Sequence, residues 1–295
     1  MNFKKINPGY LYAFLAYFCW GFFPIYWKFL KHVPLIQILA HRVLWAFIFY
    51  TIIVWVKSKK IKIYKPTSTR IFFWLTMGAC MLMCNWFIYI YAVNSNQIVE
   101  SSLGYFINPI VNILFGVFLL KEKLSKFQIM ASICAAVGVL IIAFDQGHVP
   151  WLALTLALTF SIYGLIKKTS SVSAIESNQF ESLIFTVPAL GFLFFDSYEW
   201  VTPDNVFASG LLLVGAGVVT GLPLMFFAEA AKRIPYYMMG FFQFLAPSLQ
   251  FLSGVFIFNE SLSQTKIIGF GFIWTAALML AVFSYLNHRN QIIQN

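Results

Sequence analysis

Long apolar runs separated by short polar segments dominate the sequence. An α-helix needs about 20 apolar residues to cross the hydrocarbon core of a bilayer. Runs of this kind predict ten spanning helices, at residues 10–30, 35–56, 71–93, 98–120, 125–144, 150–167, 180–196, 207–231, 235–258 and 265–286. The seventh run is the weakest, because it is short and carries Glu181 near its start. The connections between the runs are too short to hold a soluble domain.

The overall composition agrees with this pattern. Hydrophobic residues make up 60% of the 295 residues and charged residues 10%, with a mean hydropathy of +0.79. A typical soluble domain is about 25% charged. These values exclude disordered chains, secreted disulfide scaffolds, nucleic-acid-binding domains and ordinary cytosolic enzymes. The four cysteines lie in apolar runs without a histidine or carboxylate beside them, so we interpret them as packing residues and expect no metal site and no cofactor.

The lysines and arginines between the runs predict the orientation of the chain. With the N-terminus in the cytoplasm, 16 basic residues fall on the inner side and three on the outer side, while Arg42 lies within a span. The inner set is Lys4, Lys5, Lys57, Lys59, Lys60, Lys62, Lys65, Arg70, Lys121, Lys123, Lys126, Lys167, Lys168, Lys232, Arg233 and Arg289. The outer set is Lys28, Lys31 and Lys266. Positive charge is concentrated on the cytoplasmic side of membrane proteins, so both termini are expected there.

An internal repeat becomes visible when the chain is shifted by 138 residues. The stretch NPIVNILFGVFLLKEKLS then aligns with APSLQFLSGVFIFNESLS, so that Pro109 falls on Pro247, Gly116 on Gly254 and Glu122 on Glu260. Each half contains five predicted spans, and five is odd, so the second half enters the membrane from the opposite face. The fold class expected is therefore an all-α polytopic membrane protein. Its ten transmembrane helices form two inverted five-helix repeats, residues 1–148 and 149–295, around a central cavity. Inverted repeats are typical of secondary transporters, although duplication of a structural membrane protein is an alternative.

Polar residues within spans predict what lines such a cavity, because they are costly in lipid and usually face the bundle interior. Tyr105, Asn108 and Asn112 share one face of the fourth span, and Gln243 and Gln250 hold the positions equivalent to Tyr105 and Asn112 in the ninth. Asn112 and Gln250 each follow a proline, Pro109 and Pro247, that can bend its helix. We interpret this pair as two sides of a central pocket. The alternative is that both amides only hold helices together by hydrogen bonds.

Charged groups within the spans are further candidates. Arg42 lies seven residues from the outer end of its span, about 10 Å deep, and needs a partner or an anion. We expect it to pair with Glu100 or to receive an anionic group of a substrate, unless it reaches the outer headgroups instead. His41 is a candidate proton carrier or a structural, hydrogen-bonded histidine. Glu229 is another candidate for proton coupling, although an intrahelical pair with Arg233 is favoured.

Two further groups complete the predicted features. Glu122 and Glu260 close the repeated motif and are expected to act at helix termini or at the interface; neither has a companion suited to acid–base or nucleophilic chemistry. Aromatic side chains and a proline at helical spacing are expected to add to the cavity lining: Trp20, Pro24, Trp27, Trp86 and Tyr89, together with the amide of Asn85.

Several segments together resemble the EamA-type drug/metabolite transporters, and within them the RarD branch. They are AYFCWGFFPIYWKFLKHVP, LAHRVLW, CNWFIYIYAVN, ESSLGYFINPIVNILFG and LPLMFFAEAAKRIPYYMMGFFQFLAP. The resemblance implies ten helices in two inverted repeats and export of small molecules across the bacterial inner membrane. Residues of this sequence in the matching segments are carried over as candidate cavity residues: Trp20, His41, Arg42, Asn85, Tyr89, Asn108 and Gln243.

The sequence therefore favours a secondary transporter of a small metabolite or drug-like solute, and export is the expected direction. It contains no phosphate-binding loop of the kind that binds ATP and no catalytic constellation at membrane depth, so we do not expect an enzyme. A membrane binding or assembly protein that does not transport is the alternative, and a water-filled channel is a further one. The partners expected are a small-molecule substrate and lipid, with no nucleic acid. Proton coupling, and a monomer or a homodimer, stay open.

Overall fold

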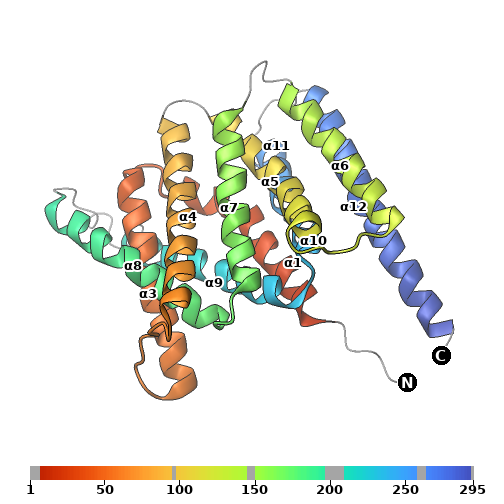
Figure 1. Ribbon diagram of the computed structural model, residues 1–295. Helices are drawn as coiled ribbons and strands as arrows, with labels where there is room; N and C mark the ends of the chain where they lie inside the picture. The colour runs from red at the N-terminus through yellow and green to blue at the C-terminus, as the bar shows by residue number, and fades with distance from the viewer. Residues whose placement is uncertain (1–6, 95–97, 145–149, 197–208, 258–263, 294–295) are drawn as a thin grey trace.

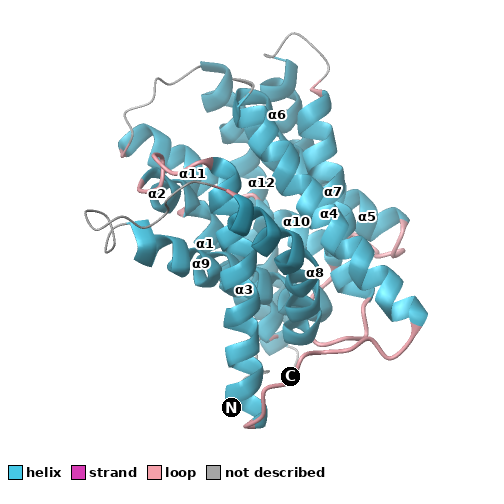
Figure 2. Ribbon diagram, turned by 90° about the vertical axis from the view of Figure 1, so that its left-hand side faces the viewer, coloured by secondary structure: helices cyan, strands magenta, loops and turns pink. Residues whose placement is uncertain are grey.

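The computed structural model describes residues 7–94, 98–144, 150–196, 209–257 and 264–293, and the regular structure in these ranges is entirely helical (Figure 2). Twelve α-helices occur there (Figure 1). Their bounds are α1 Pro8–Gly21, α2 Phe23–Lys28, α3 Leu35–Ser58, α4 Thr69–Asn94, α5 Ile98–Phe118, α6 Lys126–Phe144, α7 Trp151–Thr169, α8 Ala174–Phe195, α9 Leu211–Arg233, α10 Tyr236–Gln243, α11 Leu245–Phe256 and α12 Gln264–Ile293.

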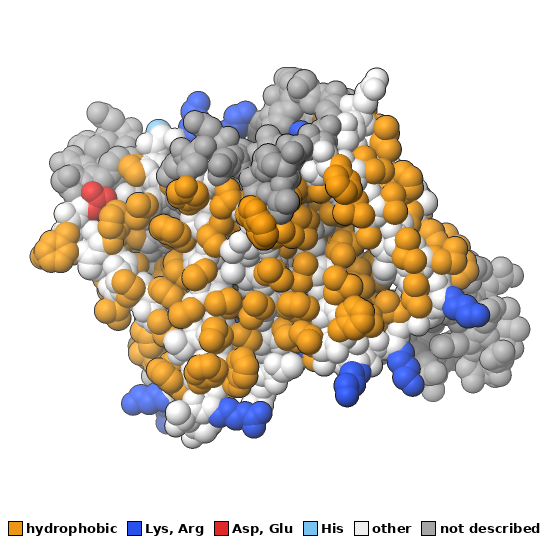
Figure 3. All heavy atoms as spheres, turned by 45° about the horizontal axis from the view of Figure 1, so that its top comes forward, with side chains coloured by type: hydrophobic (Ala, Val, Ile, Leu, Met, Phe, Trp, Pro, Cys, Tyr) orange, Lys and Arg blue, Asp and Glu red, His pale blue; other side chains and the backbone are white. Residues whose placement is uncertain are grey.

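The surface of the molecule is suited to a bilayer. Within the described residues, eight segments are long and apolar enough to cross a membrane: seven single helices and the α10–α11 pair; α5 is apolar over the shorter stretch Leu103–Phe118. Figure 3 shows a broad belt of hydrophobic side chains, with lysine and arginine side chains gathered along the edges of the belt. An apolar belt between charged edges matches the cross-section of a membrane. The chain is a multi-pass helical membrane protein, whereas the division into ten spans and two repeats remains a prediction.

The helices form a central bundle with one helix pair beside it (Figure 1). In the bundle, α1 packs along α9, α5 packs on both α7 and α10, and α4 packs on α7. Helix α3 packs on α8 and α9. Helices α6 and α12 pack side by side at the edge of the bundle, where small residues let them approach closely: a Cβ added to Gly138 would lie 2.5 Å from the carbonyl oxygen of Gly269. The bundle therefore encloses the space between α1, α3, α4, α5, α7 and α9.

Two of the predicted spans are divided into two helices each, and a proline accounts for each division. A proline removes one backbone donor, and its ring clashes with the carbonyl four residues earlier. The carbonyl four residues before Pro24 is that of Trp20, and α1 ends one residue later, at Gly21. The carbonyl four residues before Pro247 is that of Gln243, and α10 ends there. The predicted bend at Pro247 thus coincides with a helix break, while Pro109 lies inside the continuous helix α5.

The seventh predicted span begins earlier than expected. Helix α8 begins at Ala174, not near residue 180, because Ser173 caps its N-terminus. The Ser173 hydroxyl accepts a hydrogen bond from the backbone N–H of Glu176 and donates to the carboxylate of the same residue. This reciprocal cap stabilises a first turn whose polar side chains do not belong to an apolar run. The helix consequently carries Asn178 and Glu181 into the bundle, where both are buried.

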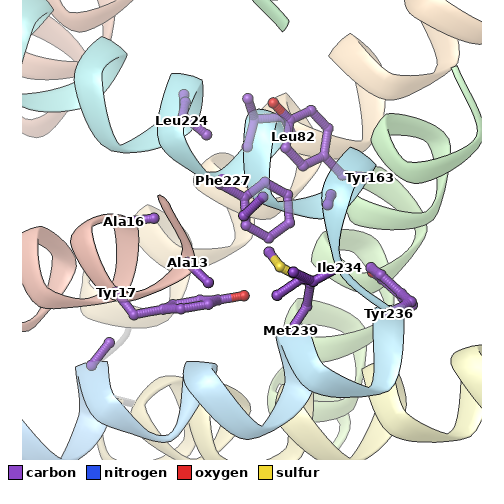
Figure 4. Close-up of a cluster of buried hydrophobic side chains, with 13 residues drawn as sticks. Ala13, Ala16, Tyr17, Leu82, Tyr163, Leu224, Phe227, Ile234, Tyr236 and Met239 are labelled. Atoms are coloured by element: carbon purple, nitrogen blue, oxygen red, sulfur yellow. The ribbon is translucent and has the colours of Figure 1, made fainter. Parts of the chain in front are cut away.

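A layer of buried apolar and aromatic side chains packs between α1, α7, α9 and α10 (Figure 4). Phe227 lies at its centre, with Tyr17, Tyr163 and Met239 around it, contributed by α9, α1, α7 and α10. All four side chains are at most 1% exposed. Such close packing leaves no passage through this layer.

Candidate functional site

A cavity of about 340 Å³ lies within the bundle, on the far side of the Phe227 layer. Eleven of the residues that the sequence predicts for the cavity wall line it: Trp20, Pro24, Trp27, Arg42, Asn85, Trp86, Tyr89, Tyr105, Asn108, Gln243 and Gln250. Pro247 also lies in the wall. Helices far apart in the sequence supply these residues, so the fold gathers them at one place. The volume is in the range of pockets that hold small molecules, about 300–1,000 Å³.

Arg42 is the only cationic side chain among the described residues that line this cavity. Its Nε donates a hydrogen bond to Thr220 Oγ1 at 3.0 Å. Its guanidinium carbon lies 4.8 Å from the ring centre of Trp27 and 4.3 Å from that of Trp86. Among the described side chains, the ion pairs are Lys167–Glu181 and Glu229–Arg233, so none of the described carboxylates pairs with Arg42. The aromatic rings hold the guanidinium in place without neutralising its charge.

Two tyrosines and two amides complete the wall around Arg42. Tyr89 and Tyr105 pack edge to face, with ring centres 6.0 Å apart. Asn85 Nδ2 donates to the carbonyl oxygen of Leu156 at 2.8 Å, which anchors α4 to α7. Gln250 Nε2 donates to the carbonyl oxygen of Trp20 at 2.9 Å. This is the carbonyl that Pro24 leaves without its helical partner, so Gln250 of α11 stabilises the break between α1 and α2.

The floor of the cavity is a network of buried polar side chains. Asn112 Nδ2 donates to Gln243 Oε1 at 2.6 Å, and Gln243 Nε2 donates to Asn108 Oδ1. Asn108 Nδ2 donates to the carbonyl oxygen of Ala157 at 2.6 Å, and the Tyr236 hydroxyl donates to Asn112 Oδ1 at 2.9 Å. The network joins α5 to α7 and α10. Asn108 and Gln243 are the members of this network that line the cavity. Asn112 does not line it and is fully buried.

The structure does not bring every predicted residue to the cavity. Asn112 and His41 are absent from its lining. His41 is buried in α3, and its Nδ1 accepts a hydrogen bond from Trp45 Nε1 at 3.1 Å. Glu229 pairs with Arg233 on the same helix, which is the interpretation the sequence favoured. The side chain of Glu100 lies outside the described part of the structure, so its predicted pairing with Arg42 stays a prediction.

Glu122 acts at a helix terminus, as the repeat predicted. Its two carboxylate oxygens accept hydrogen bonds from the backbone N–H groups of Tyr236 and Tyr237 at 2.7 and 2.9 Å. These are the first two residues of α10, whose partial positive N-terminus favours a carboxylate. Glu122 follows α5 in the chain, so the contact ties the end of α5 to the start of α10. Glu260 lies outside the described residues.

Sequence reasoning missed Thr220 and a buried ion pair between Lys167 and Glu181. Thr220 stands in an apolar, glycine-containing run and gives no signal of its contact with Arg42. Lys167 counted as a cytoplasmic loop charge, but its side chain is 0% exposed and its Nζ lies 2.7 Å from Glu181 Oε1. Glu181 stood out as a charge in a weak span, and this was the signal that could have led to the pair.

Comparison with known proteins identifies the family. Residues 7–144 match the EamA-like transporter family. The chain is 40% identical over 290 residues to the uncharacterized transporter YojE of Bacillus subtilis, covering 96% of both chains. It is 39% identical over 288 residues to Protein RarD of Salmonella typhi, again covering 96% of both. The chain belongs to the EamA-like transporter family. Within the family it is RarD-like, because the identity to RarD extends over nearly the whole chain.

This EamA-like protein is therefore a membrane transporter, and its fold has a solved counterpart. A crystal structure at 18% sequence identity superimposes with a TM-score of 0.73 over 94% of this chain and 98% of the solved one. At that identity the likeness concerns the fold alone. Within the described residues of this transporter, no group of three or more histidine, cysteine, aspartate or glutamate side chains is placed to hold a metal ion.

Proposed function

We propose that this transporter is a secondary exporter that moves a small metabolite or drug-like solute across the bacterial inner membrane by alternating access. We propose further that the solute binds in the 340 Å³ cavity and carries an anionic group, which Arg42 receives. The observation that carries the proposal is the half-buried Arg42 guanidinium, held by Thr220 and two tryptophans, without a carboxylate partner among the described side chains. A cation at this depth in the membrane is costly unless an anion neutralises it.

The remainder of the wall supports a solute with a planar or apolar body. Trp20, Phe23, Trp27 and Phe160 present aromatic surface to the cavity. Amide groups at Asn85, Asn108, Gln243 and Gln250 supply hydrogen-bonding capacity at separate points. A mainly apolar pocket with a few placed polar groups is typical of small-molecule sites. The expected solute is therefore an amphiphilic anion rather than an inorganic ion.

The helix packing supports two inverted repeats, residues 1–148 and 149–295. When each helix is replaced by its equivalent in the other half, the α1–α9 contact corresponds to the α7–α4 contact, and both occur. The α5–α7 contact corresponds in the same way to the α11–α1 contact. The contacts α3–α8, α5–α10 and α6–α12 then join equivalent helices. Two related halves around one site can rock against each other and expose it to alternate sides. With both termini in the cytoplasm, the Phe227 layer faces the cytoplasm and the cavity lies in the outer half of the membrane.

A membrane binding or assembly protein that does not transport is the alternative. In that case the cavity would hold a fixed lipid or a partner segment, and the solute would not cross the membrane. We retain from the sequence the expectation that the chain is not an enzyme. We likewise retain the expectation that it acts as a monomer or as a homodimer.

Binding and transport are tested in two steps. The purified protein in mild detergent is screened for a rise in melting temperature with organic acids, amino acids, nucleosides and amphenicols, because a ligand of the native state raises it by mass action. A compound that raises it is then tested for counterflow in proteoliposomes. Saturable counterflow of an anionic compound supports the proposal. Binding without counterflow supports the assembly protein, and preference for neutral or cationic compounds contradicts the role of Arg42.

A further inference from the structure

A second, smaller cavity lies directly behind the first. Its volume is about 30 Å³, and its wall includes Tyr50, Tyr163, Asn178 and Glu181. A water molecule needs about 10–15 Å³ of such space and two or more polar partners, so this cavity has room for water. The small cavity leads to the Lys167–Glu181 ion pair, which is not part of the Arg42 site.

The ion pair is buried completely. Lys167 Nζ donates to Glu181 Oε1 at 2.7 Å, to Ser177 Oγ at 2.9 Å and to Asn178 Oδ1 at 2.5 Å. An ammonium group has three donors, so each has a partner. The side chains of Lys167 and Glu181 are 0% and 4% exposed. Lys167 is therefore held as a fixed cation by two neutral acceptors besides Glu181.

A buried ion pair contributes little to stability, since apolar residues of the same volume are often as good. The chain has only ten acidic residues, and one of them is buried beside a lysine. We infer that this pair has a role other than stability. Of the described acidic residues with an ion pair, Glu229 is half-buried at the edge of α9, whereas Glu181 borders a cavity. Of these two, Glu181 is thus the acid that is placed to exchange a proton with water inside the bundle.

Each helix packed around Glu181 places a group near its carboxylate, and these groups affect its protonation. Helix α7 contributes Lys167 and Tyr163, α3 contributes Tyr50, and α9 contributes Lys232. Helix α4 presents Gly78, where an added Cβ would lie 3.4 Å from Glu181 Oε1. Burial of the Glu181 side chain disfavours a charge there, and the two cationic neighbours, Lys167 and Lys232, oppose this by favouring the carboxylate.

Two side chains separate the pair from the larger cavity. Trp86 and Leu224 line both cavities, and no other described residue does. Trp86 is also the ring on which Arg42 stacks at 4.3 Å. A solute that draws the Arg42 guanidinium toward its own anionic group therefore removes a contact that holds the Trp86 ring in the partition.

We propose that Lys167 and Glu181 form a proton-binding site, and that Trp86 and Leu224 form the gate between this site and the solute cavity. Glu181 accepts a proton from a hydronium ion that reaches the small cavity, which leaves a water molecule there, and becomes a neutral acid, while Lys167 remains an ammonium ion bound to Ser177 and Asn178. The proton returns to water when the gate is open and the solute cavity faces the other side of the membrane. The inference rests on the proposed transport function, which supplies the two-sided access, and it names the residues that couple transport to protons.

The test follows the protonation of Glu181 itself. Infrared difference spectra of the purified protein are recorded while the pH is lowered, because a carboxylic acid has a carbonyl band that a carboxylate lacks. The wild type and Glu229→Gln are expected to show the band of a buried acid, and Glu181→Gln is expected to lose it. The proposal is overturned if the band persists unchanged in Glu181→Gln. It is also overturned if the wild type shows no such band.

Glu181→Gln leaves Lys167 without its counter-charge and could fail to fold. The double variant Lys167→Met with Glu181→Leu then replaces the pair by apolar residues, which buried pairs commonly tolerate. It is expected to fold and to lack the same band. If it folds and retains the band, Glu181 does not bind the proton.

The gate is tested by labelling. The four native cysteines are replaced, and Leu224→Cys is exposed to a small maleimide at acidic and at alkaline pH. Each rate is divided by the rate of a free thiol with the same maleimide at the same pH, because only the thiolate reacts. The corrected rate is expected to be several-fold faster at acidic pH, and a further Glu181→Gln substitution is expected to make it fast at both. Equal slow labelling at both pH values in each protein overturns the gate. Solute binding is measured separately by the melting-temperature screen, so failure of the proton site with intact solute binding leaves the proposed function standing.

Discussion

The guanidinium carbon of Arg42 lies 4.3 Å from the ring centre of Trp86. The two residues come from α3 and α4, and their contact places a cation at the cavity wall instead of at the headgroups. We expect Trp86→Leu to weaken the binding of an anionic solute about tenfold, because loss of a desolvated cation–π contact costs about 1–2 kcal/mol. Titration of the melting temperature with the solute measures this. Trp74→Leu, on the exposed face of the same helix, serves as the control and is expected to bind normally. Equal affinities of all three proteins would contradict the prediction.

Asn112 and Gln250, which the repeat makes equivalent, are expected to respond differently to alanine. Asn112→Ala removes a side chain whose partners are buried, so we expect the free energy of unfolding to fall by about 1–2 kcal/mol while solute affinity is retained. Gln250→Ala alters the cavity wall, so we expect lower affinity. Unfolding and binding measured on both variants separate the two effects. Lower affinity with unchanged stability in Asn112→Ala would show that Asn112 reaches the solute.

The cap that Glu122 provides at the N-terminus of α10 is expected to stabilise the folded protein. Glu122→Ala leaves the N–H groups of Tyr236 and Tyr237 without their acceptor, and we expect it to lower the free energy of unfolding by about 1 kcal/mol or more. Lys123→Ala changes an exposed neighbour and should have little effect. Thermal unfolding in detergent measures both. A Glu122→Ala protein as stable as Lys123→Ala would mean that the cap is dispensable.

Gly240 is required for the close approach of α10 to α5. An added Cβ would lie 2.5 Å from the carbonyl oxygen of Pro109, which cannot move without the helix. We therefore expect Gly240→Ala to lower the free energy of unfolding by about 1–3 kcal/mol. Gly271→Ala is the matched control, because no atom lies within 4 Å of the added Cβ there. The prediction fails if the two variants unfold at the same temperature.

Most of the cavity wall could be predicted from the sequence, because polar side chains in apolar runs are few and helical spacing groups them on one face. Tyr105 and Asn108 were found in this way, and both line the cavity. The same spacing extends to Asn112, yet Asn112 lies below the cavity floor. The reason is the crossing of α10 at Gly240, which covers this turn of α5, and a periodicity along one helix contains no information on where another helix crosses it.

The ion pair shows a second limit. Lys167 stands between an apolar run and a polar connection, and a basic residue in that position ordinarily faces the cytoplasm. The early start of α8 at the Ser173 cap places Glu181 two turns inside its helix, where it draws Lys167 into the bundle. The cap signal was present in the sequence, but it lay in a polar segment outside the apolar runs that defined the spans.

The central claim is that Arg42 binds the anionic group of a solute in the cavity. The most direct measurement is the dissociation constant of a solute found in the melting-temperature screen, for the wild type, Arg42→Lys and Arg42→Gln, with Arg70→Gln as the control at an exposed arginine. We predict that Arg42→Gln weakens binding at least about tenfold, or about 1.4 kcal/mol, that Arg42→Lys retains part of the affinity, and that Arg70→Gln binds as the wild type does. Unchanged binding by a folded Arg42→Gln protein would contradict the account.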